Sequence, residues 1–370
     1  MKKEGLPMAC QTTTVHLSPE LFGDNEKTLL DCGPLSASVF KYSTGVAALR
    51  FQNEFGEAVL LPFQGQQVWS ATFHGRNLTM RSMFSEPQAT RDYLATYGAF
   101  FIHCGATAMG NPGEKDRHPL HGELPNAPFQ KAWIVCGADD DGHYLGLGGA
   151  YEHTMAFGPH YVCEPLLKFY ADSSVMRMSV TLRNLKHVPM EWMYLAHINF
   201  NPVENSRLVY TARCTPEHVR VRKTIPTHIA VSPKYRRCLE EFAVHPEKHN
   251  DLTADLFFDP EVCFFIDYEA DKKGWAHTLQ IHPDGTADYV RHHPSQLDKA
   301  VRWICRVADQ AAIGIVLPAT AEPDGYHAEK AKGNIKVIPP LGEVTFDYDM
   351  GMLSAPDAAR LAKKIVAKYH

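Results

Sequence analysis

Apolar and polar residues alternate along most of the chain. Residues 36–63, "SASVFKYSTGVAALRFQNEFGEAVLLPF", follow this pattern and are interrupted at Gly45 and Gly56. The same alternation recurs in residues 174–200 and 255–293. The turns expected within these two segments lie at residues 184–188, 271–274 and 283–285. Period-two alternation places successive side chains on opposite faces of a strand, and turn residues every ~8–12 positions are typical of antiparallel sandwiches. We therefore predict an all-β fold, a large antiparallel β-sandwich with few short helices.

Helical periodicity appears at two places. The C-terminal segment, residues 354–370, places Ser354 where it can cap a helix and has apolar residues at four-residue spacing. A shorter helix is predicted at residues 232–246, where Leu239 and Phe242 would face the sheet.

The domain organisation is predicted to be simple. The chain has no linker rich in Pro, Ser and Gly, no repeat of 20–50 residues and no βαβ alternation. We predict one β-sandwich domain at residues 1–370, with N-terminal strands in residues 1–47 and a C-terminal helix at residues 354–370 as additions.

Composition narrows the possible partners. The 370 residues carry a formal net charge of −5, so there is no basic field for nucleic acid. The longest apolar runs are strand-sized, and the first residues, "MKKEGLPMACQTTTVHL", lack the apolar core of a secretion signal. Nine widely spaced cysteines without a Cys-x-x-Cys pair favour reduced thiols. We expect a cytoplasmic monomer or homodimer without nucleic-acid or membrane partners.

Candidate chemistry concentrates on histidines. The stretch "DRHPLHGELPNAP", residues 116–128, places His118 and His121 three residues apart. These two histidines, with His197 and a carboxylate, could bind a metal, but Pro119 disfavours the helix that would put them on one face. Two other interpretations remain open from the residues alone. One is an acid–base site, because the ordinary histidine pKa lies near neutrality, and the other is a turn satisfied by the backbone.

Two motifs in fixed order resemble the galactose mutarotase, or aldose 1-epimerase, superfamily. They are Leu-His-Gly at residues 120–122 and "HINFN" at residues 197–201, the second at the end of an apolar strand. The flanking segments "YGAFFIHCGATAMGNP", "VLLPFQGQQVWSATFHGRNL" and "VIPPLGEVTFDYDM" are similar to a divergent branch described only as aldose 1-epimerase-like. The resemblance covers residues 48–350 and implies the β-sandwich that the alternation also predicts.

The resemblance implies roles for three residues. Members of this superfamily interconvert sugar anomers by opening the ring, with one group removing the C1 hydroxyl proton and another protonating the ring oxygen. It makes His197 the acid, His121 a sugar-binding residue, and a glutamate near the C-terminus the base. In "IGIVLPATAEPDG" the Glu-Pro pair comes five residues later than the family register. We take Glu322 as the expected base, with Asp324 or Glu329 as alternatives.

Further residues are expected around the sugar, and no cofactor or metal is needed. Trp303 offers an apolar platform for sugar C–H groups, and either Arg81 or Arg91 supplies the early arginine of the family. The full set of expected binding residues is His121, His118, Asp267, Arg81, Trp303 and Asn199.

The predicted function is therefore an aldose 1-epimerase-like isomerase acting on a free or modified monosaccharide. Three alternatives stay open. The first is a non-catalytic carbohydrate-binding or sensing protein on the same fold, since the glutamate is displaced. The second is a hexose-phosphate 1-epimerase-like enzyme, which would need an arginine-rich pocket. The third is a metal-dependent sugar isomerase that uses the histidines.

Overall fold

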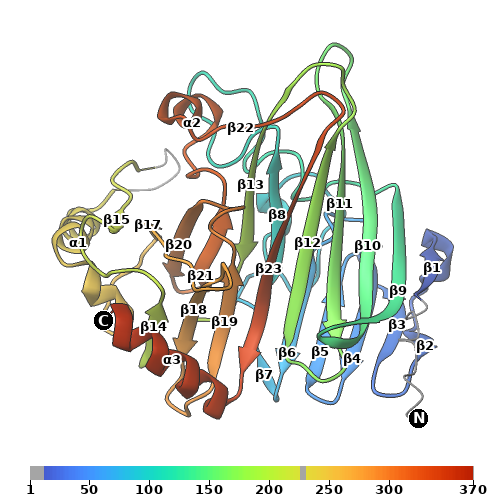
Figure 1. The fold of residues 1–370 in the computed structure, drawn as a ribbon, viewed down its shortest axis with the longest axis horizontal. Helices are drawn as coiled ribbons and strands as arrows, with labels where there is room; N and C mark the ends of the chain where they lie inside the picture. Colours follow the sequence, from blue (N-terminus) through green and yellow to red (C-terminus); the bar gives the residue numbers. More distant parts are fainter. Residues whose placement is uncertain (1–11, 226–230, 370) are drawn as a thin grey trace, which may run out of the picture.

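The computed structural model describes residues 12–225 and 231–369, and within them it shows two large antiparallel sheets packed face to face (Figure 1). One sheet has ten strands and the other has thirteen. The alternating segments of the sequence form strands of both sheets, so the predicted antiparallel β-sandwich is confirmed. Among the described residues, no helix is both long enough and apolar enough to cross a membrane.

The ten-stranded sheet contains the longest strands. In spatial order its strands are β1 (Thr13–Leu17), β9 (Lys131–Asp139), β10 (Gly142–Thr154), β11 (His160–Tyr170), β12 (Val175–Asn184), β23 (Glu343–Leu353), β19 (Ala287–His292), β18 (Ala276–Ile281), β14 (Ser206–Tyr210) and β16 (Asp251–Leu252). The expected turns at residues 271–274 and 283–285 precede β18 and β19.

The thirteen-stranded sheet contributes the strands that carry the expected chemistry. Its main path is β15 (Val219–Val221), β17 (Val262–Ile266), β20 (Lys299–Arg306), β21 (Ala311–Ala319), β13 (Met190–Ile198), β8 (Phe101–Ala106), β6 (Val68–Phe73), β5 (Gly56–Leu60), β4 (Ala47–Asn53), β3 (Ser36–Lys41) and β2 (Lys27–Asp31). Two short strands lie off this path, β22 (Lys336–Ile338) beside β13 and β7 (Arg76–Asn77) beside β6.

The helices lie outside the two sheets. Both predicted helices are present, as α1 (Pro233–Val244), which Ser232 caps by accepting from the backbone of Tyr235, and α3 (Ala355–Tyr369). A third helix, α2 (Tyr326–Lys332), was not predicted. Short 3-10 turns are formed by Pro19–Leu21, Leu94–Thr96 and Pro246–Asn250.

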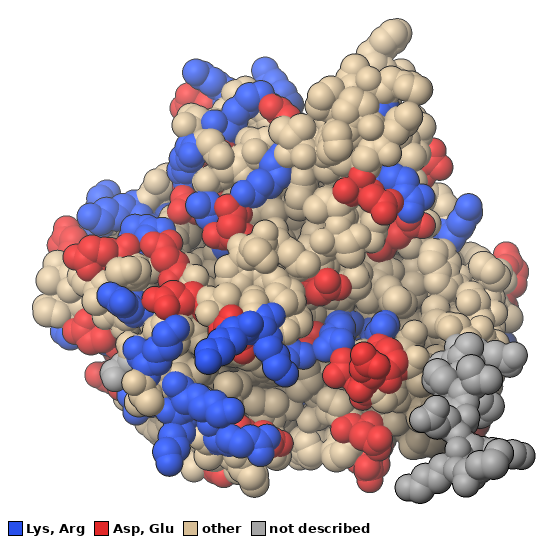
Figure 2. Space-filling model, viewed as in Figure 1, with Lys and Arg blue, Asp and Glu red and all other residues tan. Residues whose placement is uncertain are grey.

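The outer face of the ten-stranded sheet carries charges of both signs (Figure 2). Basic side chains gather over α3, with acidic side chains beside them. On the neighbouring strands Asp349 accepts hydrogen bonds from Arg177 at 3.0 Å and from Arg291 at 2.6 Å. This face therefore carries ion pairs among charges of both signs and does not form a field of one sign.

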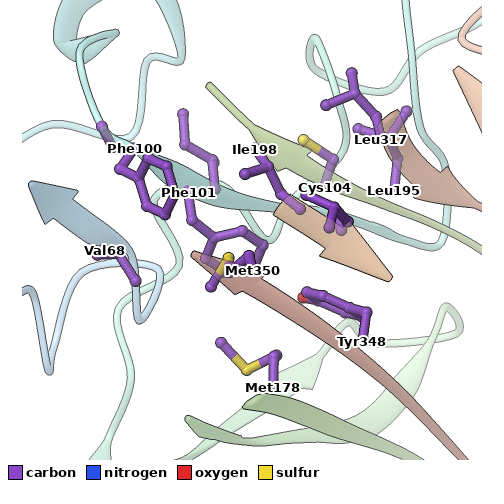
Figure 3. Packing of buried hydrophobic residues seen from close by; sticks show 14 of the residues in the cluster. Val68, Phe100, Phe101, Cys104, Met178, Leu195, Ile198, Leu317, Tyr348 and Met350 are labelled. Carbon is purple, nitrogen blue, oxygen red and sulfur yellow. The ribbon is translucent and has the colours of Figure 1, made fainter. Parts of the chain in front are cut away.

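The core fills the space between the sheets. Every residue of β8 is buried, and β8 pairs with β13 so that Ile102 lies opposite His197. Figure 3 shows Phe101 and Ile198 facing Tyr348 and Met350 of β23 in the other sheet. These central strands are covered on both faces, which gives them long apolar runs in place of strict alternation.

We expect Phe101→Ala to lower the free energy of unfolding by about 3–5 kcal/mol, because it leaves a cavity between the two sheets. Phe101 is fully buried, whereas Phe157 is fully exposed. Phe157→Ala is therefore the matched control and is expected to change stability by less than about 0.5 kcal/mol. Urea unfolding measures both, and similar small losses in the two variants would contradict the packing described here.

Candidate functional site

A cavity of about 670 Å³ lies on the face of the thirteen-stranded sheet that points away from the core. Strand alternation explains this placement. On β13 the hydroxyl of Tyr194 meets the hydroxyl of Tyr348 in the other sheet at 2.8 Å, so His197, three residues later, points the opposite way and lines the cavity. On β20, Arg302 points toward the other sheet and its neighbour Trp303 lines the cavity.

The ring of His197 is held in one orientation and one tautomer. Its Nδ1 lies 2.7 Å from Oδ1 of Asn199, whose Nδ2 donates to the carbonyl of Ala99 at 3.0 Å. Since that amide bond leaves Oδ1 as an acceptor, Nδ1 of His197 carries the proton. Burial lowers the pKa of His197 to about 4. At neutral pH the ring is uncharged and Nε2 presents a lone pair to the cavity.

His121 presents the complementary group. Its ring lies beside Tyr93 and beside His197, with centroids 4.9 and 5.4 Å away. Burial lowers the pKa of His121 well below its ordinary value, and nearby positive charge, including that of the Arg222 guanidinium, acts in the same direction. Nδ1 of this neutral ring is buried without a hydrogen-bond partner. We assign the proton to Nε2, because this leaves no N–H donor buried without a partner, and Nε2 then offers a donor toward the cavity.

The loop that carries His121 has an unusual backbone. His121 itself has a φ of 60°, and its N–H donates to the carbonyl of Gly110 at 3.0 Å. The next residue, Gly122, has a φ of 83°, and a Cβ there would lie 2.4 Å from the carbonyl oxygen of Gly105. Glycine is thus required at this position by both conformation and space.

A buried carboxylate holds this loop against β8. Glu123 accepts from the backbone of Thr107 at 2.9 Å, from its hydroxyl at 2.9 Å, from the backbone of Ala106 at 3.2 Å and from the hydroxyl of Tyr161 at 2.6 Å. Charge-assisted hydrogen bonds of this kind are stronger than neutral ones. Glu123 therefore fixes the loop two residues after the histidine that reaches the cavity.

One wall of the cavity is formed by linked polar groups. The indole N–H of Trp303 donates to Glu261 at 2.7 Å, and Arg222 donates to the other oxygen of the same carboxylate at 2.5 Å. Trp303 lies edge-on to His197, with centroids 5.4 Å apart. The carboxylate thus orients both an aromatic platform and a guanidinium.

The charges on the cavity wall are unequal. Three carboxylates, of Asp259, Glu261 and Asp309, line it together with one guanidinium, that of Arg222. Most of the other lining side chains are apolar or aromatic. The cavity therefore suits a neutral or cationic ligand better than an anion.

Of the residues expected at the site, the structure brings His121, His197 and Trp303 together along the cavity. Asn199 lies behind His197, where it orients the ring without lining the cavity. His118 lies apart from His121, because its Nδ1 donates to the carbonyl of Pro119 at 2.8 Å and its Nε2 faces the backbone N–H of Tyr326. The two histidines of "HPLHG" are therefore not a pair.

Two expected binding residues lie outside the cavity. The guanidinium of Arg81 donates to the carbonyls of Val307 and Ala308 and serves to join two loops. Asp267 pairs with Arg220 on the surface, at 2.5 Å. Both residues were expected at the site from their position along the sequence. In the structure their side chains instead bind nearby carbonyl groups or an ion-pair partner.

Glu322, the expected base, also lies outside the cavity lining, although its neighbour Pro323 belongs to that lining. Its carboxylate pairs with Lys332 at 2.6 Å, and the same ammonium contacts Asp324 and Glu329 at 2.7 and 2.8 Å. The oxygens of these three acids could surround a cation, and here the lysine takes that position. Lys332 belongs to α2, a helix that the sequence did not predict. Its ion pair with Glu322 holds the glutamate carboxylate outside the cavity lining.

Glu261 and Arg222 are the residues that sequence reasoning missed. Glu261 directly precedes β17, within residues 255–293, which the alternation predicts to form strands. A carboxylate at a strand end was a usable signal. Arg222 offered no such signal in the sequence. It comes close to Glu261 only because distant segments pair, and its backbone N–H donates to the carbonyl of Cys263 at 2.8 Å.

The family comparison gives one match, to the model described as "Domain of unknown function (DUF4432)", over residues 43–352. No curated protein matches the chain.

Solved structures share the fold at low sequence identity. A "putative aldose 1-epimerase" from Klebsiella pneumoniae is 15% identical with a TM-score of 0.77, over 97% of this chain and 96% of that one. A galactose mutarotase-like protein from Clostridium acetobutylicum is 12% identical with a TM-score of 0.59, over 86% of this chain and 98% of that one. The fold is thus the mutarotase-like β-sandwich.

We expect Glu123→Gln to lower the free energy of unfolding by about 2 kcal/mol or more, because an amide turns one acceptor into a donor that faces other donors. The matched control is Glu152→Gln, since Glu152 is half-exposed and its carboxylate, among the described residues, pairs only with His160. The expected change for this control is below about 0.5 kcal/mol. Urea unfolding compares the two, and equal effects would contradict the anchoring role of Glu123.

Buried histidines predict that the protein loses stability in mild acid. Burial lowers the pKa to about 4 in His197 and to about 3 in His103 and His292. Between these values and 6.5 the unfolded chain binds more protons than the folded one, so stability rises with pH in this window and falls as pH drops below 6.5. Each group contributes up to about 1.4 kcal/mol per pH unit.

Urea unfolding from pH 7 to pH 5 measures this slope. His292→Phe keeps a buried ring but cannot bind a proton. We expect it to reduce the slope of unfolding free energy against pH by the contribution of one histidine, up to about 1.4 kcal/mol per pH unit. An unchanged slope in that variant would show that His292 already titrates normally in the folded protein.

Proposed function

We propose that this chain, which belongs to the family described as "Domain of unknown function (DUF4432)", is an aldose 1-epimerase-like enzyme. It would interconvert the α and β anomers of a monosaccharide by opening and closing the sugar ring. The mutarotase-like fold is consistent with this reaction, and the proposal itself depends on the cavity.

One observation carries the proposal. The rings of His197 and His121 line the same cavity with their centroids 5.4 Å apart; in the tautomers assigned above, His197 offers a lone pair and His121 a donor. A hemiacetal needs this combination, because its C1 hydroxyl must lose a proton while its ring oxygen must accept a hydrogen bond and then a proton. Both rings are neutral and held in place, so both can act at neutral pH without a metal or cofactor.

The reaction follows from these two groups. Nε2 of His197 takes the proton of the C1 hydroxyl while the bond between C1 and the ring oxygen breaks, which gives the open-chain aldehyde. The ring oxygen keeps the electron pair of the broken bond and receives the proton back from His197. Rotation about the bond between C1 and C2 and the reverse steps close the ring as the other anomer. His121 stabilises the ring oxygen as a neutral donor, as a neutral histidine can do where charge develops.

This assignment revises the roles expected from the sequence. A histidine with a pKa of about 4 is almost entirely unprotonated at neutral pH, so His197 begins as the proton acceptor rather than the acid. Glu322 is replaced in that role because its carboxylate is paired with Lys332 away from the cavity. Trp303, fixed by Glu261, offers its face to the C–H groups of the sugar.

A second candidate, a non-catalytic sugar-binding protein, is favoured by a specific observation. Glu261 lines the cavity, but both of its oxygens already accept hydrogen bonds, from Trp303 and Arg222. If the reaction needed a free carboxylate as its base, this cavity would bind a sugar without converting it, because the carboxylate of Glu261 is already occupied. The hexose-phosphate alternative is less favoured, since one guanidinium faces three carboxylates on the cavity wall.

We expect wild-type protein to accelerate anomer exchange of at least one aldose, and His197→Gln to lower kcat by about 100-fold or more. Exchange NMR on a panel of aldoses measures this rate. Glu322→Gln is the matched control and is expected to stay within about twofold of wild type. The rate is expected to fall as pH drops toward 4, where His197 becomes protonated.

One result would contradict the enzyme proposal, and two others would contradict the mechanism given for it. Saturable sugar binding without exchange would favour the binding protein. Loss of exchange in Glu322→Gln would return the base to the position expected from sequence. Loss of exchange on treatment with a chelator would favour a metal-dependent isomerase.

A further inference from the structure

The mouth of the cavity carries exposed apolar side chains. Met83 and Leu94 are 71% and 59% exposed, and both line the cavity. Large exposed hydrophobic groups are normal singly, but two at the rim of one cavity indicate contact with an apolar ligand.

These side chains stand on a fixed backbone. The segment before Met83 pairs with the sheet, because Arg81 and Ala311 exchange backbone hydrogen bonds at 2.9 and 3.0 Å. The hydroxyl of Ser82 donates to the carbonyl of Tyr97 at 2.8 Å, which ties this segment to the turn that presents Leu94. The rim is thus built to hold its apolar side chains in place.

Much of the cavity wall between this rim and the histidines is apolar. Phe84, Tyr97, Val307 and Leu317 line it, as does Leu195, two residues before His197 on β13. An unsubstituted sugar has hydroxyls along most of its edge, and each one loses free energy when it is buried without a partner. A volume of about 670 Å³ is in the range of pockets for drug-sized ligands, so it holds more than one pyranose ring.

Charge limits the ligand further. Asp259 and Asp309 line the cavity in addition to the ion-paired Glu261 and Arg222. A phosphate or carboxylate on the sugar would meet net negative charge, so the ligand carries no negative group.

From these observations we infer that the cavity takes a neutral reducing sugar that bears an apolar substituent, such as an alkyl group, in contact with Met83 and Leu94. The hemiacetal end lies at His121 and His197, and the substituent lies against the apolar part of the cavity wall toward the rim. This inference rests on the proposed function for the placement of the hemiacetal, whereas the apolar subsite is independent of catalysis.

The test compares D-glucose with its 3-O-butyl and 6-O-butyl ethers and with glucose 6-phosphate in exchange NMR. We expect kcat/KM to be tenfold or more higher for at least one butyl ether than for glucose, and the phosphate to be the poorest substrate. The double variant Met83→Ser, Leu94→Ser is expected to remove most of the preference for the ether. Because both side chains are exposed, these changes leave the core intact. Phe157→Ser, which removes an exposed apolar side chain outside the cavity, is the matched control and is expected to keep the preference.

A binding measurement separates this inference from the proposed function. Methyl 3-O-butyl- and methyl 6-O-butyl-glucoside cannot open their rings, so calorimetry with them, against methyl glucoside, measures the apolar subsite without chemistry. Tighter binding of a butyl compound, lost in the double variant, supports the subsite even if no sugar is exchanged. Equal rates for glucose and both ethers, equal binding of the glucosides, or a preference for the phosphate would overturn the inference and leave an observed exchange activity standing.

Discussion

The site depends on the fact that the central strands of the thirteen-stranded sheet are buried on both faces. On β13 the even-numbered Tyr194 meets Tyr348 across the core, while the odd-numbered His197 faces the cavity. A shift of one residue in the pairing of β13 with β8 would exchange these two environments. A slip would also take the hydroxyl of Tyr194 away from His103 and Tyr348, its hydrogen-bond partners on the core side. Packing of the core and placement of the reactive ring are therefore one constraint.

The same constraint decides how much could be predicted from the sequence. Alternation predicted the sandwich, four-residue periodicity after Ser354 predicted α3, and the spacing of Leu239 and Phe242 predicted α1, because these signals act within one element. His121, His197 and Trp303 were found from motifs and residue type. Glu261 and Arg222 were missed because a cross-strand ion pair depends on which strands become neighbours. Glu322 was misplaced for a related reason: Lys332 of α2, ten residues away in sequence, captures its carboxylate.

Local backbone chemistry explains why the first histidine motif needs its glycine. Gly122 adopts a positive φ beside the carbonyl of Gly105, and Glu123 then ties the chain to Thr107 and Tyr161. The Leu-His-Gly motif therefore encodes a turn that only glycine permits, followed by a carboxylate anchor. His118, three residues before His121, falls outside this anchored turn, so it points toward α2 and not into the cavity.

Burial has two opposing consequences for the reactive histidines. It lowers the pKa of His197 to about 4, which keeps the lone pair available but makes Nε2 a weak base. The weakness matters least for a reaction in which the proton moves from one oxygen of the hemiacetal to the other, because no lasting charge has to form on the ring. It would matter more for a reaction that leaves an anion in the cavity, beside Asp259 and Asp309. The electrostatics of this cavity therefore favour a reaction that begins and ends neutral, and anomer exchange is such a reaction.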